Sequence, residues 1–148
     1  MSENETEFNL TALDYAQITS LLNGNLQSMD KGDWQSFIAD YTDDGIFFHP
    51  YRKLNIEGQT NLKQFLISFA EKPNNKIITH WESNIAIQVG TTKHSAINNS
   101  YWQAIKDGII ITIGTHMDEL KKVDGKWKIQ KRTVLVKWTK EEGNVQTD

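Results

Sequence analysis

The sequence predicts an α+β domain, in which a strongly curved, mostly antiparallel sheet packs on three helices from the N-terminal half. Apolar residues recur at helical spacing before residue 72, whereas residues 77–138 hold four long runs rich in β-branched and aromatic residues. Helices that precede a long sheet cover one of its faces. Strands of roughly 12 residues must twist and bend, so we expect a cone that encloses a pocket.

Three helices are expected in the first half. The first is expected to start after Thr11, which can cap its free amides, with Asp14 three residues on. Its apolar face is predicted to comprise Leu13, Ile18, Leu21, Leu22, Leu26 and Met29. Asp33 is a good cap for a short second helix. That helix is predicted to carry Trp34, Phe37, Ile38 and Tyr41. The third, with Leu62, Phe65, Leu66 and Phe69, is expected to end at Pro73.

The strands are expected to form a meander. A short strand over 46–49 follows a predicted turn at 43–45, and four long strands are predicted over 77–89, 95–105, 109–120 and 127–138. Asp107-Gly108 and Asp124-Gly125 are typical hairpin turns, so these neighbours should pair antiparallel. We expect one domain over residues 10–138, flanked by polar, flexible tails at 1–9 and 139–148.

Composition narrows the function classes. The chain has 148 residues, no cysteine and a formal net charge of −3. These values exclude disulfides and thiolate-bound metals, and they give no electrostatic reason to expect nucleic acid as a partner. The N-terminal residues lack the pattern of a signal peptide, and no apolar run approaches the roughly 20 residues that cross a bilayer. We therefore expect a cytoplasmic protein without a membrane partner.

Several short motifs, taken together, resemble a known family. They are Met29-Asp30-Lys31-Gly32-Asp33-Trp34, Tyr41-Thr42-Asp43-Asp44-Gly45, Gly58, Thr79-His80 with Asn84, Ala96 with Ser100-Tyr101, Gly114 with Asp118, and the segment 124–132. In this order they resemble SnoaL-like proteins of the nuclear transport factor 2-like superfamily, over about residues 10–138. Relatives include scytalone dehydratase, ketosteroid isomerase, bile-acid dehydratase and the small subunit of ring-hydroxylating dioxygenases. The resemblance implies the fold, which hosts many activities.

The resemblance also implies a catalytic pair. His80 matches the general acid/base of the family's dehydratases, and Asp30 matches the acid that partners it. Histidine suits proton transfer because its pKa lies near working pH, and a carboxylate would fix its tautomer. Asp30 could instead cap a turn, and His80 could be structural. Because Ile85 and Ile87 share strand parity with Trp81, either a bulge lies between residues 80 and 85 or the pocket is on the other face.

Other residues are candidates for substrate binding. His116 matches a polar substrate-binding position of scytalone dehydratase, and Asp118 shares its face, so the two could form a catalytic or a surface pair. Asn25 stands where some family dehydratases have a tyrosine, and Ser100 falls near their second histidine; both departures weaken the case for dehydration. Further candidates for the pocket wall are Trp34, His49, Tyr51 and Trp102. Arg132 matches a frequent arginine of the family and is expected to form a structural ion pair.

No metal or cofactor motif is present. The sequence has no His-Glu-x-x-His pattern, no nucleophile elbow and no phosphate-binding glycine loop. The leading hypothesis is a cofactor-free dehydratase, isomerase or cyclase that acts on a small, apolar, cyclic molecule through His80 and Asp30. The alternatives are a ligand-binding protein without catalysis, and a structural partner resembling a dioxygenase small subunit. Long exposed strands also predict a homodimer or higher homo-oligomer.

Overall fold

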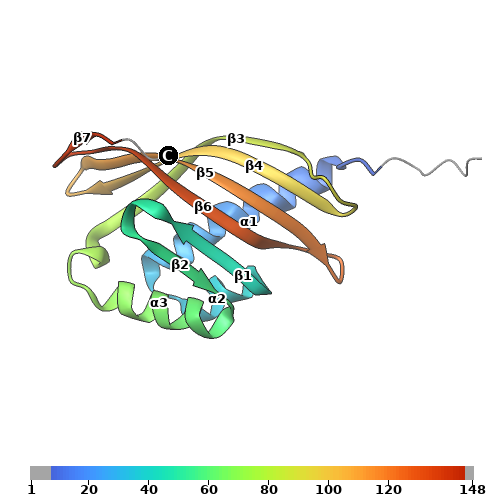
Figure 1. Ribbon diagram of the computed structural model, residues 1–148, viewed down its shortest axis with the longest axis horizontal. Helices are drawn as coiled ribbons and strands as arrows, with labels where there is room; N and C mark the ends of the chain where they lie inside the picture. Colours follow the sequence, from blue (N-terminus) through green and yellow to red (C-terminus); the bar gives the residue numbers. More distant parts are fainter. Residues whose placement is uncertain (1–7, 146–148) are drawn as a thin grey trace, which may run out of the picture.

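Three helices pack on one face of a curved, unclosed seven-stranded sheet (Figure 1) in a computed structural model that describes residues 8–145. The helices are α1 (Ala12–Lys31), α2 (Trp34–Ala39) and α3 (Gln59–Glu71), with short 3-10 turns at Pro50–Arg52 and Asn75–Ile77. The strands are β1 (Tyr41–His49), β2 (Leu54–Glu57), β3 (Ile78–Val89), β4 (Ser95–Lys106), β5 (Ile109–Val123), β6 (Lys126–Thr139) and β7 (Gly143–Asn144). The predicted α+β class is confirmed.

The sheet order is β2-β1-β6-β5-β4-β3, and β7 pairs with β6. The four long strands form the predicted antiparallel meander, while β1 pairs parallel to β6. This parallel pair brings the end of β1 beside the middle of β6, where Phe48 lies opposite Thr133. Residues of β1 and of β6, which are far apart in the sequence, therefore border the same interior face of the sheet.

Helix α1 forms as its caps predict. The Thr11 backbone amide donates to Asp14 Oδ2 at 2.9 Å, and the Asp14 amide donates to Thr11 Oγ1 at 3.1 Å, which completes a capping box. Asp14 also accepts a hydrogen bond from Trp127 Nε1 at 2.9 Å, so the same carboxylate ties the helix to β6. Leu13 departs from the predicted apolar face, since 64% of it is exposed. Among the described residues, no helix has the length and apolar character to cross a membrane.

The region after α2 differs from the prediction. Tyr41 does not belong to the helix; it opens β1, where it is buried and its ring lies 5.3 Å from that of Phe37. The predicted turn at 43–45 is instead an irregularity within β1, between Tyr41 and Ile46. Gly45 permits it, because a Cβ there would come within 2.8 Å of the Tyr41 side chain. The short strands β2 and β7 were not predicted.

The core lies between the helices and the inner face of the sheet. Its buried members include Ile18, Leu22, Phe37, Leu62, Leu66, Leu120, Trp127, Ile129 and Val136. Phe8 and Val145, at the two ends of the described chain, are half-buried against this core. Of the predicted tails, residues 1–7 and 146–148 lie outside the described residues, whereas residues 139–144 form the end of β6, a turn and β7.

Candidate functional site

A small cavity lies between helix α1 and the inner face of the sheet. It has a volume of about 40 Å³. Its walls are formed by Asn25, Leu26, Met29, Phe47, His49, His80, Trp102, His116, Arg132 and Val134. This volume holds a few water molecules, whereas sites for drug-sized ligands begin at roughly 300 Å³. At this volume the cavity has room for the reacting group of a ligand but not for a large molecule.

A bulge in β3 turns His80 toward this cavity. The pairing of β3 with β4 shifts between Ser83 and Ala86, and Asn84 adopts a left-handed backbone with φ of 55°. The extra residue changes the strand's phase, so His80 and Ile87 both face inward although their numbers differ in parity. Trp81 points outward and is 59% exposed. The bulge therefore settles the conflict of strand phase that the sequence left open.

Asp30 holds His80 through two hydrogen bonds. Asp30 lies in the last turn of α1, and its Oδ1 is 2.6 Å from Nδ1 of His80. Its second oxygen, Oδ2, accepts the backbone amide of His80 at 2.9 Å. The side chains of His80 and Asp30 are only 13% and 16% exposed. Because an ionised carboxylate only accepts hydrogen bonds, Nδ1 of the neutral ring carries the hydrogen and Nε2 is left as the basic nitrogen.

A second carboxylate–histidine pair joins β3 to β5 across the intervening strand β4. His116 Nδ1 is 3.1 Å from Glu82 Oε1, and both side chains are buried. Burial acts to raise the pKa of Glu82, but the charge of Arg132 and the hydrogen bond from His116 outweigh it and lower that pKa to about 2. Burial and the nearby Arg132 lower the pKa of His116. At neutral pH this pair is therefore a carboxylate bonded to a neutral imidazole.

Arg132 links this pair to a second acid. Its Nε donates to Asp118 Oδ1 at 2.7 Å, and its Nη2 donates to Asp118 Oδ2 and Glu82 Oε1, each at 3.1 Å. The predicted ion pair of Arg132 is present, and Asp118 belongs to it rather than to the cavity wall. Ser100 likewise lies behind the wall, where its hydroxyl donates to Glu82 Oε1 at 2.5 Å. This network fixes Glu82, and through it His116.

Trp102 separates the two histidines. Its ring centre lies 6.1 Å from that of His80 and 5.7 Å from that of His116, with the latter ring nearly parallel at 15°. The indole Nε1 donates to the carbonyl oxygens of Thr115 and Leu135, both at 3.2 Å. Gly114 makes this position possible, since a Cβ there would lie 2.6 Å from Nε1. The cavity thus has an imidazole on each side of an apolar indole.

The structure gathers some of the other predicted site residues and disperses the rest. Asn25 and His49 line the cavity, and Asn25 Nδ2 also donates to the Phe37 carbonyl at 3.2 Å, which links α1 to α2. Trp34 lies away from it, beneath the ammonium of Lys63 at 3.9 Å from the ring centre. Tyr51 lines a separate open groove rather than the cavity. The assignment of Trp34 and Tyr51 to this cavity is not supported by their positions.

Glu82, which contacts His116 behind the cavity wall, was not predicted from the sequence. It lies two residues after His80 on β3, and both side chains face inward. That spacing was the available signal, because alternate residues of a strand point to one side. Its partner His116 comes from β5, and the register places His116 directly opposite Ser100. A cross-strand neighbour of this kind is not visible in one sequence.

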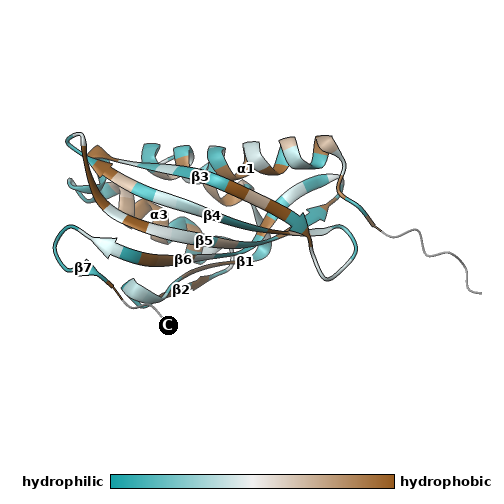
Figure 2. Ribbon diagram, turned by 90° about the horizontal axis from the view of Figure 1, so that it is seen from above, coloured by the Kyte–Doolittle hydropathy of each residue, from teal (hydrophilic) through white to brown (hydrophobic). Residues whose placement is uncertain are grey.

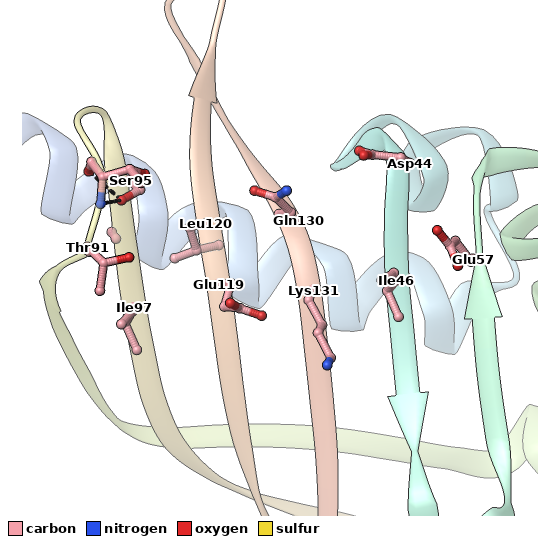
Figure 3. A pocket seen from close by; sticks show the side chains of 13 residues that line it. Asp44, Ile46, Glu57, Thr91, Ser95, Ile97, Glu119, Leu120, Gln130 and Lys131 are labelled. Atoms are coloured by element: carbon pink, nitrogen blue, oxygen red, sulfur yellow. Dashed lines mark hydrogen bonds between the residues drawn. The ribbon is translucent and has the colours of Figure 1, made fainter.

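Other parts of the surface offer less chemistry. An open hollow of about 310 Å³ lies over β1, β6, β5 and β4, on the sheet face turned away from helix α1 (Figure 3). Its charged residues include Glu119 and Lys131, which are register neighbours, and no histidine lines it. Within residues 8–145, no group of three histidine, aspartate or glutamate side chains is placed to hold a metal ion.

His49 should make the protein sensitive to mild acid. Burial, followed by the charge of Arg52, lowers the pKa of His49 to about 4. The unfolded chain, with a histidine pKa near 6.5, takes up this proton first. Relative to lower pH, the neutral His49 therefore adds up to about 3 kcal/mol to the free energy of unfolding. This contribution is complete above about pH 6.5 and is lost as the pH falls through about 4.

We accordingly expect His49→Gln to flatten this pH dependence. Urea denaturation at pH 7 and pH 4.5 should show a smaller loss of unfolding free energy in the variant than in the natural protein, by up to about 3 kcal/mol. His94→Gln is the matched control, because His94 is exposed. Equal losses in the natural protein and in His49→Gln would contradict the assignment.

Comparisons with known proteins agree with this architecture. The model of the SnoaL-like domain family matches residues 10–133. A Nostoc punctiforme protein of unknown function with a cystatin-like fold has a TM-score of 0.77 and 24% identity, covering 87% of this chain and 95% of its own. ActVI-ORFA from Streptomyces coelicolor has a TM-score of 0.70 and 21% identity, with 85% and 98% covered.

A further similar structure is a protein from Novosphingobium aromaticivorans provisionally named scytalone dehydratase. It has a TM-score of 0.69 and 19% identity, covering 92% of this chain and 90% of its own. A comparison with curated protein sequences gives no significant match. At these identities the structural likeness establishes a shared fold.

Proposed function

We propose that this chain, which belongs to the SnoaL-like domain family, is a small-molecule enzyme of the dehydratase, isomerase or cyclase type that works without a cofactor. The observation that carries the proposal is the bond of 2.6 Å between Asp30 and His80 at the wall of a buried cavity. A histidine whose tautomer is fixed by a carboxylate is suited to proton transfer.

In this reaction His80 is the general base. Its Nε2 takes a proton from a carbon next to a carbonyl group, and Asp30 stabilises the imidazolium that forms. Return of that proton to another carbon gives an isomerase. Its transfer to a departing hydroxyl group gives a dehydratase, and the carbanion's attack on a second carbonyl gives a cyclase. The likeness to a protein provisionally named scytalone dehydratase supports the second of these.

The cavity walls favour a small and largely apolar substrate. Apolar walls come from Leu26, Met29, Phe47, Trp102 and Val134, and a cyclic hydrocarbon frame would lie against them. Asn25, His49 and His116 offer polar atoms on the same wall, which would hold the substrate's oxygen-bearing end. The volume of about 40 Å³ requires side chains to move before a ring can enter.

A screen of small cyclic ketones and β-hydroxy ketones, followed by NMR, tests this proposal. We expect the protein to convert at least one of them, and His80→Ala to lose turnover while keeping most of its affinity for that compound. Binding without any conversion would favour the alternative of a non-catalytic ligand-binding protein. Neither binding nor conversion would favour a structural role beside a larger partner.

We also propose that two copies of this chain associate through the outer face of the sheet. Figure 2 shows apolar segments among polar ones along β3, β4 and β5. Exposed on that face are Trp81 at 59%, Tyr101 at 52%, Met117 at 47% and Ile113 at 38%. Register places these residues on neighbouring strands, with Trp81 beside Gln103 and Gln103 beside Ile113. An apolar face of this kind favours a self-complementary contact.

Sedimentation at micromolar concentration tests the association. A dimer is expected for the natural protein and a monomer for Tyr101→Glu, because burying an added charge in the contact costs free energy. Leu13→Glu is the control, since Leu13 is an exposed apolar residue on helix α1, away from the sheet face. Sedimentation of the natural protein as a monomer would contradict the proposed association.

A further inference from the structure

One nitrogen of the Arg132 guanidinium has no hydrogen-bond partner within residues 8–145. Its Nε and Nη2 are bonded to Asp118, and Nη2 also bonds Glu82. The remaining nitrogen, Nη1, is buried and has no hydrogen-bond partner among the described residues. The whole side chain is only 1% exposed. Such buried, charged donors nearly always have a partner, so an unpaired one calls for an explanation.

The position of Arg132 indicates where that partner would come from. Three buried side-chain atoms in the described chain have no partner: Tyr41 Oη, Asn98 Oδ1 and Arg132 Nη1. Of the three residues, Arg132 is the one that lines the cavity. Because the guanidinium is planar and Asp118 occupies the edge formed by Nε and Nη2, Nη1 lies on the opposite edge. Because Arg132 lines the cavity and Nη1 is its unpaired nitrogen, we look for the missing acceptor in a ligand bound there.

We propose that Nη1 of Arg132 binds the carbonyl oxygen of a neutral substrate and holds the negative charge that forms there when His80 removes the neighbouring proton. This inference rests on the proposed function, and it narrows the substrate class to enolisable ketones and aldehydes without a carboxylate at the reacting end. It also gives Arg132 a role beyond the ion pair with Asp118.

The charges around the cavity favour a neutral substrate over an acid. Asp30, Glu82 and Asp118 stand within one or two residues of the cavity wall, and Arg132 is the permanent cation that bonds two of them. A substrate carboxylate would enter beside these buried acids and meet repulsion in a region of low dielectric. A neutral carbonyl group avoids this cost, and its oxygen gains charge only during the reaction.

The step balances in atoms and electrons. The proton on the carbon next to the carbonyl moves to Nε2 of His80, and the C–H electron pair forms a carbon–carbon double bond. The carbonyl π electrons move to the oxygen, which becomes an enolate oxyanion bonded to Nη1. The oxyanion then restores the carbonyl, and the proton on His80 either returns to carbon or leaves with a β-hydroxyl group as water.

A matched series of ligands tests the assignment on the unaltered protein. Cyclohexanone has an acceptor oxygen, methylenecyclohexane has nearly the same shape without one, and cyclohexanecarboxylate carries a charge. We expect cyclohexanone to bind at least about tenfold more tightly than either of the others, as one charge-assisted hydrogen bond implies. Equal binding of the first two, tighter binding of the carboxylate, or no saturable binding of any would overturn the proposal.

The infrared stretch of bound cyclohexanone, labelled with ¹³C at the carbonyl, gives a readout that a merely structural role would not move. The stretch should lie at lower frequency on the protein than in water, and Arg132→Lys should remove this shift. The lysine keeps a positive charge beside Glu82 and Asp118 but has no counterpart of Nη1. A shift that persists in Arg132→Lys contradicts the assignment.

The two proposals fail in different ways. A low-frequency stretch without any conversion of ketones would support Arg132 as the oxygen-binding group while sinking the enzymatic function. Conversion of ketones without the shift would leave the function standing and remove Arg132 from it.

Discussion

Asp30→Asn is expected to lower turnover by roughly 10²–10⁴-fold, although the side chain keeps its size. The reason lies in the two hydrogen bonds that Asp30 makes. The backbone amide of His80 donates to one oxygen, so an asparagine must place its carbonyl oxygen there and its amide group against Nδ1 of His80. The amide donates to Nδ1, which moves the ring hydrogen to Nε2 and removes the basic nitrogen from the cavity.

Steady-state kinetics on a converted ketone would measure this effect. Asp43→Asn serves as the control, because Asp43 is an exposed carboxylate at the start of β1. The ¹⁵N chemical shifts of His80 should report the exchanged tautomer in Asp30→Asn and the natural one in the control. Full activity in Asp30→Asn would show that the carboxylate does not set the state of His80.

Arg132→Met is expected to destabilise the fold by about 3–5 kcal/mol. The change leaves Glu82 and Asp118 buried without their cation, and both carboxylates have completely buried side chains. Loss of Arg132 also removes the main influence that keeps the pKa of Glu82 at about 2, so Glu82 would take up a proton on folding. Urea denaturation at pH 7 measures the loss.

Neutralising the two acids should recover much of that stability. Glu82→Gln and Asp118→Asn, added to Arg132→Met, remove the unpaired charges while keeping the shape of the network. Replacing a buried ion network by neutral groups is often close to neutral in free energy. A loss of less than about 1 kcal/mol in Arg132→Met alone would contradict the network as described.

The sequence predicts much of the fold because its local signals agree with one another. The Thr11–Asp14 capping box, the Asp33 cap and the two Asp-Gly hairpins each determine an element from neighbouring residues alone. Where tertiary packing decides, the prediction fails: Tyr41 belongs to a strand because β1 pairs with β6, which lies about ninety residues later in the chain. The short strands β2 and β7 likewise depend on their partners.

In the candidate site, too, some contacts could be predicted from the sequence and others depend on tertiary packing. The Asp30–His80 pair could be inferred because the family resemblance carries it, and the bulge at Asn84 was one of two alternatives that strand phase required. The Glu82–His116 pair could not, since strand register brings those residues together. Nor does composition fix the size of a cavity, because volume depends on how side chains such as Trp102 pack.

The most direct test of the account is the rate at which the protein exchanges the protons next to the carbonyl of cyclohexanone for deuterium in D₂O. This exchange needs no knowledge of the natural substrate, because it records only proton removal and return. We expect catalysed exchange by the natural protein and a rate near the uncatalysed one in His80→Gln. Exchange that is unchanged in His80→Gln, or absent from a natural protein that binds the ketone, would contradict the claim that His80 and Asp30 form a proton-transfer pair.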